Sequence, residues 1–211
     1  MDEVYRGRLA ALERTWQVWA ETGRSLTEDQ WTAESRCVGW DVAALYTHHS
    51  LFPLTLSAPP GSSAEPDGEP VTAVEALRSF NAPEGLAHTM ADAVETRAVD
   101  EAAQHTRQEL ADVYGVHGPR AVERLRGIDA ARRMRWGSTG LVVTVAEGSR
   151  MVLMEATVHL LDVQRALRLP PDVPPAALRD TALLLAELAP PVDLIEAATG
   201  RSQRSPLPVL R

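Results

Sequence analysis

The run MVLMEATVHLLDVQRALRL, residues 151–169, predicts one long and mostly apolar helix. It carries Glu155, His159 and Asp162, which are spaced so that they share one face of that helix. Polar side chains on an apolar helix raise the free energy of the folded state unless a partner satisfies them. A divalent metal ion bound by Glu155 and His159 is one such partner.

The same spacing has a simpler explanation. A direct contact between Glu155 and His159 in the core would satisfy both side chains without an ion. The Glu-x-x-x-His pattern is also much less specific than the His-Glu-x-x-His pattern of zinc enzymes. The helix alone therefore leaves both explanations open, and the metal hypothesis depends on a third ligand elsewhere in the chain.

The composition suits a globular protein of the cytoplasm. The chain has 211 residues, of which 45% are hydrophobic, and this fits a single domain over residues 1–211. No apolar run is long enough to cross a membrane, and the N-terminus lacks the features of a signal peptide. Cys37 is the single cysteine, so no internal disulfide can form. The net charge of −8 argues against nucleic acid or an anionic membrane as a partner.

The absence of lysine excludes several kinds of chemistry. All 21 basic residues are arginine, which rules out Schiff-base catalysis, a pyridoxal-phosphate lysine and a P-loop lysine. The G-x-S-x-G sequence of the serine hydrolase nucleophile elbow does not occur either. No internal nucleophile of these kinds is therefore present.

Apolar residues recur at three- and four-residue steps along most of the chain, which is typical of helices. Besides the helix above, helices are expected at residues 2–21, 41–58, 72–80, 87–114, 176–188 and 192–199. Residues 121–126 are expected either to extend the helix at 87–114 or to form a short separate helix after Gly118 and Pro119. Gly23 should end the first of them, and Pro53 should kink or end the second. Asp41 and Thr144 are candidate N-caps, and residues 132–136 should be a short extended segment. The pattern predicts an all-α fold, a four-helix bundle with short accessory helices.

Three regions of the sequence resemble the motifs of one known family. Residues 26–31 read LTEDQW and residues 37–48 read CVGWDVAALYTH, similar to the family pattern L-T-x-x-x-W…C-P-G-W-x-V-x-D-L-x-x-H. Residues 155–162, EATVHLLD, resemble its E-x-x-x-H-G-x-D pattern, and residues 192–201 resemble its usual ending. On these motifs the chain is similar to the N-terminal domains of mycothiol-dependent maleylpyruvate isomerases. These domains belong to the DinB-like superfamily of metal-binding four-helix bundles.

The resemblance implies a metal site formed by His48, Glu155 and His159, with His49 as a structural or supporting neighbour. Two histidines and one carboxylate leave coordination positions open, as catalytic sites require. Zinc is the ion to expect first, and Fe(II), Ni(II) and Mn(II) suit the same ligands. The resemblance also implies mycothiol, a low-molecular-weight thiol, as a cofactor.

Four further residues are candidates for roles at this site. Asp162 is a candidate catalytic residue that hydrogen-bonds a ligand histidine. Arg165 is a candidate for catalysis and for binding an anionic cofactor or substrate, with a surface ion pair as the alternative. Trp40 is a candidate cofactor-binding residue or a core anchor. Cys37 precedes a helix start, where the pKa of a thiol can fall, so a nucleophile and a small buried side chain both remain open.

The chain also departs from the family pattern. Val38 replaces a proline, Ala44 replaces an aspartate, and Leu160 and Leu161 replace a pair of the Gly-Trp type. The last change lies beside the expected site and bears on the substrate pocket. We also expect no second, C-terminal domain of the kind that the family carries.

Three functions are compatible with these residues. The first is a metal-dependent isomerase or S-transferase that uses mycothiol on a small electrophilic substrate. The second is a thiol-independent, metal-dependent tailoring enzyme of specialised metabolism, and the third is a non-catalytic metal-binding or stress protein. The expected partners are a small-molecule substrate and a low-molecular-weight thiol, and the expected assembly is a monomer or a homodimer.

Overall fold

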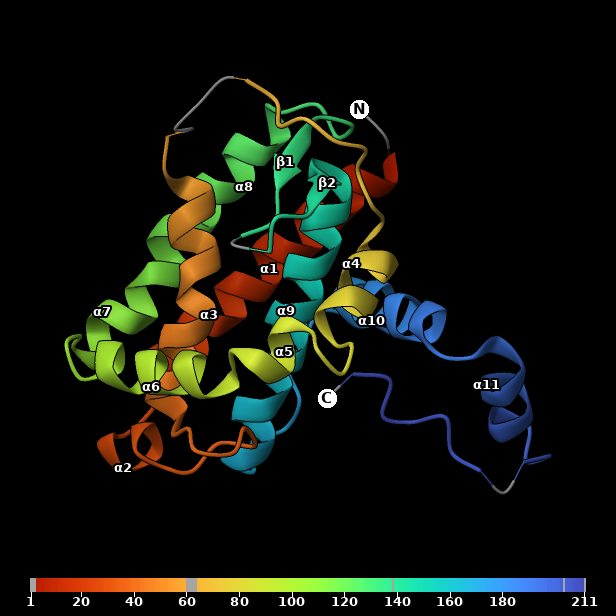
Figure 1. Cartoon of the computed structure of the whole chain (residues 1–211). Helices are drawn as coiled ribbons and strands as arrows, with labels where there is room; N and C mark the ends of the chain where they lie inside the picture. Colours follow the sequence, from red (N-terminus) through yellow and green to blue (C-terminus); the bar gives the residue numbers. More distant parts are fainter. Residues whose placement is uncertain (1–2, 60–63, 138, 203, 211) are drawn as a thin grey trace.

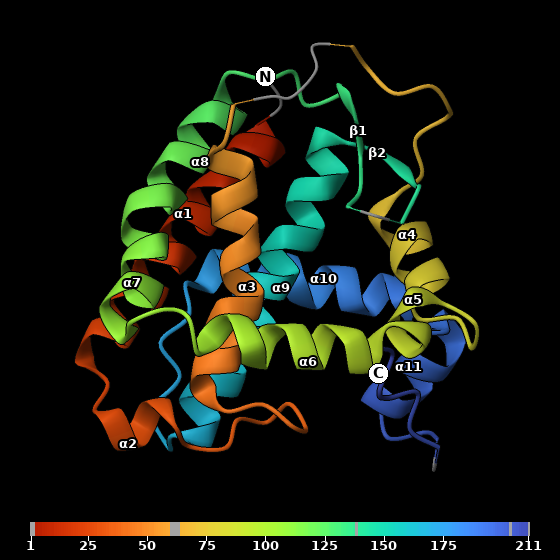
Figure 2. The ribbon, with the colours of Figure 1, turned by 60° about the vertical axis from the view of Figure 1, so that its left-hand side comes forward.

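The computed structural model describes residues 3–59, 64–137, 139–202 and 204–210. Four long helical segments form a bundle (Figures 1 and 2). They are α1 (Glu3–Ser25), α3 (Val42–Ser57), the continuous segment from α7 (Arg107–Asp112) to α8 (Gly118–Arg126), and α9 (Val145–Ala166). The prediction of an all-α four-helix bundle is confirmed.

Shorter helices surround the bundle. They are α2 (Glu28–Trp31), α4 (Ala73–Phe80), α5 (Leu86–Thr89), α6 (Ala91–Ala102), α10 (Pro175–Leu188) and α11 (Pro191–Ala198). Helix α6 packs across α3, and α10 packs on α9 and α1 (Figure 2). Helix α11 extends away from the bundle (Figure 1). None of the helices in the described ranges is long and apolar enough to span a membrane.

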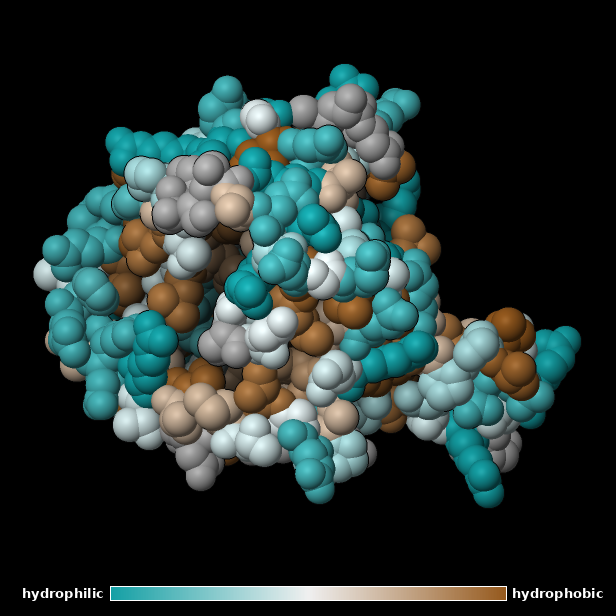
Figure 3. Space-filling model, turned by 45° about the horizontal axis from the view of Figure 1, so that its top comes forward, coloured by the Kyte–Doolittle hydropathy of each residue, from teal (hydrophilic) through white to brown (hydrophobic). Residues whose placement is uncertain are grey.

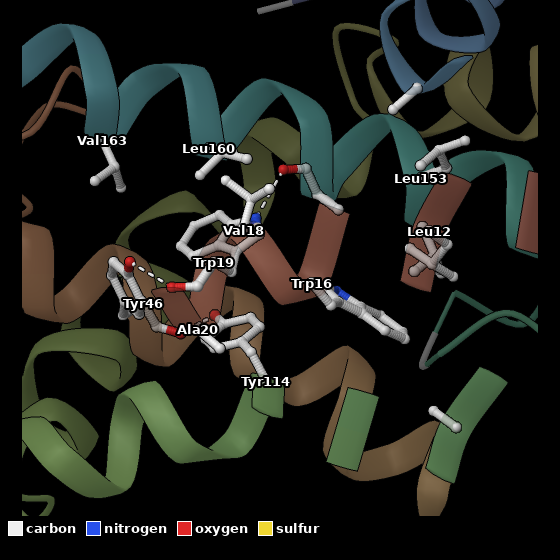
Figure 4. Close-up of a cluster of buried hydrophobic side chains, with 14 of the residues drawn as sticks. Leu12, Trp16, Val18, Trp19, Ala20, Tyr46, Tyr114, Leu153, Leu160 and Val163 are labelled. Atoms are coloured by element: carbon white, nitrogen blue, oxygen red, sulfur yellow. Dashed lines mark hydrogen bonds between the residues drawn. The ribbon is translucent and has the colours of Figure 1, made fainter. Parts of the chain in front are cut away.

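The bundle core is aromatic where α1 meets α3 and the α7–α8 segment. Trp16, Trp19, Tyr46 and Tyr114 are fully buried there. The indole N–H of Trp19 donates to the carbonyl of Ala156 at 2.9 Å, and its ring stacks on Tyr114 with the centroids 4.9 Å apart. The hydroxyls of Tyr46 and Tyr114 donate to the backbone carbonyls of Trp19 and Tyr46 (Figure 4). The large rings are thus buried with their polar atoms satisfied.

The alanine-rich segment expected as one helix over residues 87–114 is divided in the structure, so that prediction was wrong. Helix α6 ends at Ala102, and a new helix begins at Arg107. Thr106 caps this new helix, because its side chain accepts from the N–H of Glu109 and its own N–H donates to the Glu109 carboxylate at 2.8 Å. This reciprocal capping box is a strong local start signal.

At its other end, α7 leads into a helical segment that continues through Gly118 and Pro119. A π-helical turn, Val113–His117, joins α7 directly to α8. Pro119, which has no N–H to donate, then lies in the first turn of α8, directly after the π-helical turn. Of the two alternatives for residues 121–126, the structure therefore has the extension of the preceding helical segment.

Neither Gly23 nor Pro53 ends the helix in which it lies, and a kink at Pro53 stays a prediction. Helix α1 continues past Gly23, and α3 continues through Pro53. A Cβ at Gly23 would lie only 3.0 Å from the side-chain carbons of both Ala111 and Tyr46. A larger side chain here would force Ala111 or Tyr46 to move, because α7 packs against α1 and the Tyr46 side chain of α3 reaches it.

A small hairpin leads into α9. Strand β1 (Arg133–Arg135) pairs antiparallel with β2 (Val142–Thr144), which confirms the extended segment expected at residues 132–136. The side chain of Thr144 accepts from the N–H of Glu147 at 3.1 Å and caps α9. The hairpin and this cap fix where α9 begins.

Asp41 caps α3 in the same manner, since its carboxylate accepts from the N–H of Ala44 at 2.7 Å. We expect Asp41→Ala to lower the free energy of unfolding by about 1 kcal/mol, because that N–H loses its partner. Asp41→Asn keeps an acceptor and should change stability little. Urea denaturation followed by circular dichroism measures both, and equal losses in the two variants would contradict the capping role.

Candidate metal centre

Helices α3 and α9 pack side by side and bring His48, Glu155 and His159 together. The ring centroids of His48 and His159 are 5.6 Å apart, and Nε2 of His159 lies 3.2 Å from Oε2 of Glu155. One ligand atom from each side chain can be chosen so that all three lie within 4.8 Å of one another. Ligands on a tetrahedral zinc ion lie roughly 3.3 Å apart, so small side-chain movements would suffice. The donor set fits a divalent ion, and the binding of one stays a prediction.

The charges in this cluster also suit a cation. Burial, together with the charge of His159, lowers the pKa of His48 to about 4, so its imidazole is neutral at pH 7 and can donate a lone pair. Burial alone would raise the pKa of Glu155, but its hydrogen bond to His159 holds the value below the ordinary one. Burial would lower the pKa of His159, but its hydrogen bonds to Asp162, Cys37 and Glu155 raise it well above the ordinary value. The two carboxylates thus stabilise a positive charge between them.

Asp162 and Cys37 lie at the other nitrogen of the His159 ring. Nδ1 of His159 is 3.2 Å from Oδ2 of Asp162. This is the kind of contact that fixes the orientation of a metal-binding histidine. The sulfur of Cys37 is 4.0 Å from the same Nδ1 and 3.8 Å from Oδ2 of Asp162. The sequence carried no signal for this contact, because 122 residues separate Cys37 from His159.

A tight turn positions Cys37. The N–H of Trp40 donates to the carbonyl of Cys37 at 3.1 Å, and Gly39, the third residue of the turn, has a φ of 81°. These features define a type II turn, which favours glycine at that position. The turn leads directly into α3, so one continuous segment places both Cys37 and His48.

Val38, the second residue of this turn, is 94% exposed. Proline fits the second position of a type II turn, because its fixed φ matches the value required there. We expect Val38→Pro to raise the free energy of unfolding by about 0.5 kcal/mol, chiefly by restricting the unfolded chain. Chemical denaturation tests this, with Val38→Ala as the control. A loss of stability in the proline variant would show that the turn is of another type.

Trp40 and His49 complete the surroundings of His48. The Trp40 ring lies 4.7 Å from that of His48, and its buried Nε1 has no hydrogen-bond partner among the described residues. This N–H is therefore available to a ligand, although the role of Trp40 in cofactor binding stays a prediction. His49 is fully buried and accepts from the Trp16 indole at 3.2 Å, which makes it part of the core.

The structure places two unexpected arginines at the cluster. Nη1 of Arg36 lies 3.9 Å from Oδ1 of Asp162, and the charge of Arg97 on α6 contributes to the lowered pKa of His48. Neither followed from the sequence, because the segments that carry them approach the site only in the tertiary structure. Arg165 is exposed near the end of α9, and its roles in catalysis and cofactor binding stay predictions.

The approach to the cluster is partly apolar. Phe52, one helical turn after His48, stacks on Trp136 with the ring centroids 6.1 Å apart. The surface is hollowed between α3 and the hairpin, with hydrophobic residues along its walls (Figure 3). Apolar walls with a few charged groups suit a small organic ligand.

The fold and this cluster define a helical bundle with a candidate metal site between two of its helices. The model of the family described as "Mycothiol maleylpyruvate isomerase N-terminal domain" matches residues 12–164. The chain belongs to this family, and the resemblance seen in its motifs is confirmed. All three candidate metal ligands lie within the matched segment.

Two solved structures share the fold. One is described as the mycothiol-dependent maleylpyruvate isomerase, with 14% sequence identity, a TM-score of 0.57 and coverage of 90% of this chain and 72% of that chain. The other is a histidine-to-alanine mutant of a mycothiol-dependent maleylpyruvate isomerase, with 12% identity and the same TM-score and coverage. No curated protein matches this chain. At such low identity the similarity shows the fold alone, so the chemistry must be argued from the site.

Proposed function

We propose that this protein is a metal-dependent isomerase that uses mycothiol, or a related low-molecular-weight thiol, on a small electrophilic substrate. The observation that carries the proposal is the cluster of His48, Glu155 and His159 in a chain of this family. The substrate class is an organic acid with a cis double bond conjugated to a carbonyl group.

The residues of the chain would bind and orient the reactants. A divalent ion, zinc first and otherwise Fe(II), Ni(II) or Mn(II), would lower the pKa of a thiol at an open coordination position. His48 is neutral at pH 7 and therefore suited to bind the ion. Asp162 orients the ring of His159 through Nδ1, and Trp40 offers its free indole N–H to the thiol or the substrate.

The reaction requires no further reagent. The thiolate uses an electron pair of its sulfur to form a bond to the conjugated carbon. The electron pair of the double bond shifts toward the carbonyl oxygen, and the single bond that remains can rotate. Elimination of the same thiolate restores the double bond in the trans form and regenerates the thiol. Release of the adduct after protonation would instead be S-transfer. Arg36 and Arg97 would hold the carboxylate of the substrate by charge, and Arg165 remains a further candidate for this role.

A thiol-independent, metal-dependent tailoring enzyme is the second candidate, and the departure from the family pattern at Leu160 and Leu161 favours it. Leu160 is fully buried in the same core cluster as Trp19 (Figure 4). Leu161 is partly buried against that cluster. The side chain of Leu160 thus fills the core, which leaves Leu161 as the change that bears on the pocket. A non-catalytic metal-binding protein is the third candidate.

A turnover assay with a cis-enone acid separates these candidates. Metal-loaded protein with mycothiol should isomerise the acid, and activity should vanish when the thiol is omitted while the ion stays bound. Calorimetry should detect mycothiol binding that is lost in His48→Ala and kept in His105→Ala, a variant of an exposed histidine. If fully metallated protein binds no mycothiol, the proposal is wrong and the thiol-independent enzyme replaces it.

The proposed setting is the cytoplasm, where reduced low-molecular-weight thiols are abundant. The proposed assembly is a monomer or a homodimer. Size-exclusion chromatography with light scattering distinguishes the two.

A further inference from the structure

His159 presents a different set of metal-binding groups at each of its two ring nitrogens. Nε2 faces Glu155, with His48 nearby, as described above. Nδ1 faces Oδ2 of Asp162 at 3.2 Å and Sγ of Cys37 at 4.0 Å. The second set, Cys37, His159 and Asp162, therefore combines a sulfur, a nitrogen and an oxygen donor.

The spacing of this second set matches that of ligands on one ion. Donor atoms at the corners of a tetrahedral zinc site lie roughly 3.3–3.6 Å apart, given the usual metal–ligand bond lengths. The three separations here are 3.2 Å for nitrogen to oxygen, 3.8 Å for sulfur to oxygen and 4.0 Å for sulfur to nitrogen. Each differs from the ideal by less than about half an ångström, which a side-chain rotation can supply.

The set is built from rigid parts. Cys37 is held by the type II turn and by a hydrogen bond from its N–H to Oγ of Ser35 at 3.1 Å, while His159 and Asp162 lie on α9. All three side chains are partly buried, so an ion can reach them from solvent. The guanidinium of Arg36, at 3.9 Å from the other oxygen of Asp162, is 59% exposed and can move aside.

We propose that Cys37, His159 and Asp162 form a second cation site, which binds a thiophilic divalent ion such as Zn²⁺ or Cd²⁺ on the Nδ1 side of His159. A thiolate ligand favours such ions over Mn²⁺ or Mg²⁺. Binding there displaces the thiol proton of Cys37 and the proton on Nδ1 of His159, which both pass to solvent, and Oδ2 of Asp162 then faces the ion in place of the Nδ1–H group. Asp162 orients the His159 ring while this site is empty and becomes a ligand when it is filled. The two sites share His159, but the second needs no thiol-dependent turnover, so either proposal can fail without the other.

The alternative to a second site is a single ion on Nε2 of His159. In that arrangement Nδ1–H donates to Asp162, and the Cys37 side chain only fills space. Cobalt distinguishes the two arrangements, because a thiolate bound to Co²⁺ gives an intense charge-transfer absorption in the near ultraviolet that nitrogen and oxygen ligands do not give. Cys37 is the single cysteine of the chain, so this absorption can arise from no other residue. The titration uses untagged protein, Co²⁺ and a reductant that contains no thiol.

We expect the thiolate band in the unmodified protein and its loss in Cys37→Ser. We also expect it to persist in His48→Ala or in Glu155→Gln, which damage the first site and spare the second. Circular dichroism identifies a variant that fails to fold. If one of these two variants does not fold, persistence of the band is judged in the other. If the unmodified protein shows no band, or if the band disappears in both folded variants, the second site does not exist. In the latter case the thiolate belongs to the first ion.

Discussion

Replacing His159 by alanine should abolish binding of the divalent ion. His159 is the ligand that lies closest to a carboxylate partner, with Nε2 3.2 Å from Glu155, and its loss leaves only two ligands from different helices. The affinity should fall by more than the roughly 10- to 100-fold that loss of an outer hydrogen-bond partner causes. The bundle should stay helical, because the side chain is only partly buried and the aromatic core lies elsewhere.

Metal analysis of the purified variant, with calorimetric titration of Zn²⁺, measures this effect. His105→Ala is the matched control, since it removes an exposed histidine outside the cluster. The unmodified protein should bind at least one ion per chain with high affinity. Full metal occupancy in folded His159→Ala would show that the cluster of His48, Glu155 and His159 is not a metal site.

Replacing Trp19 by alanine should be among the most destabilising core substitutions. The side chain is fully buried, stacks on Tyr114 and His49 with centroids 4.9 and 5.0 Å away, and donates to the carbonyl of Ala156 on α9. Truncation of a buried tryptophan leaves a cavity and costs about 3–5 kcal/mol. Here it also removes the hydrogen bond from the indole to the carbonyl of Ala156 within α9.

Chemical denaturation of the metal-free protein measures this loss, so that a bound ion does not contribute to stability. Trp19→Phe is the matched variant, because it keeps an aromatic ring and loses the N–H. It should cost clearly less than the alanine variant. A loss below about 1 kcal/mol for Trp19→Ala would contradict the assignment of this ring to the core.

The sequence by itself determined the features that depend on neighbouring residues. The apolar stripes predicted the long helices, and Asp41 and Thr144 were identified as caps because a cap contacts N–H groups only three residues away. Spacing along one helix likewise placed Glu155 and His159 on a common face. The motif around residues 37–48 and the one at residues 155–162 together indicated the family, which the match over residues 12–164 confirmed.

The tertiary structure decided whatever depends on packing between distant segments. Gly23 reads as a helix end in the sequence, yet it lies inside α1, where Tyr46 and Ala111 leave little room for a larger side chain. Cys37 had no evident partner in the sequence, and it lies beside His159 and Asp162 because the turn before α3 packs against α9. Local periodicity carries no information on contacts between residues more than a hundred positions apart. The contact of Cys37 with His159 therefore depends on how the segment leading into α3 packs against α9, which no local pattern encodes.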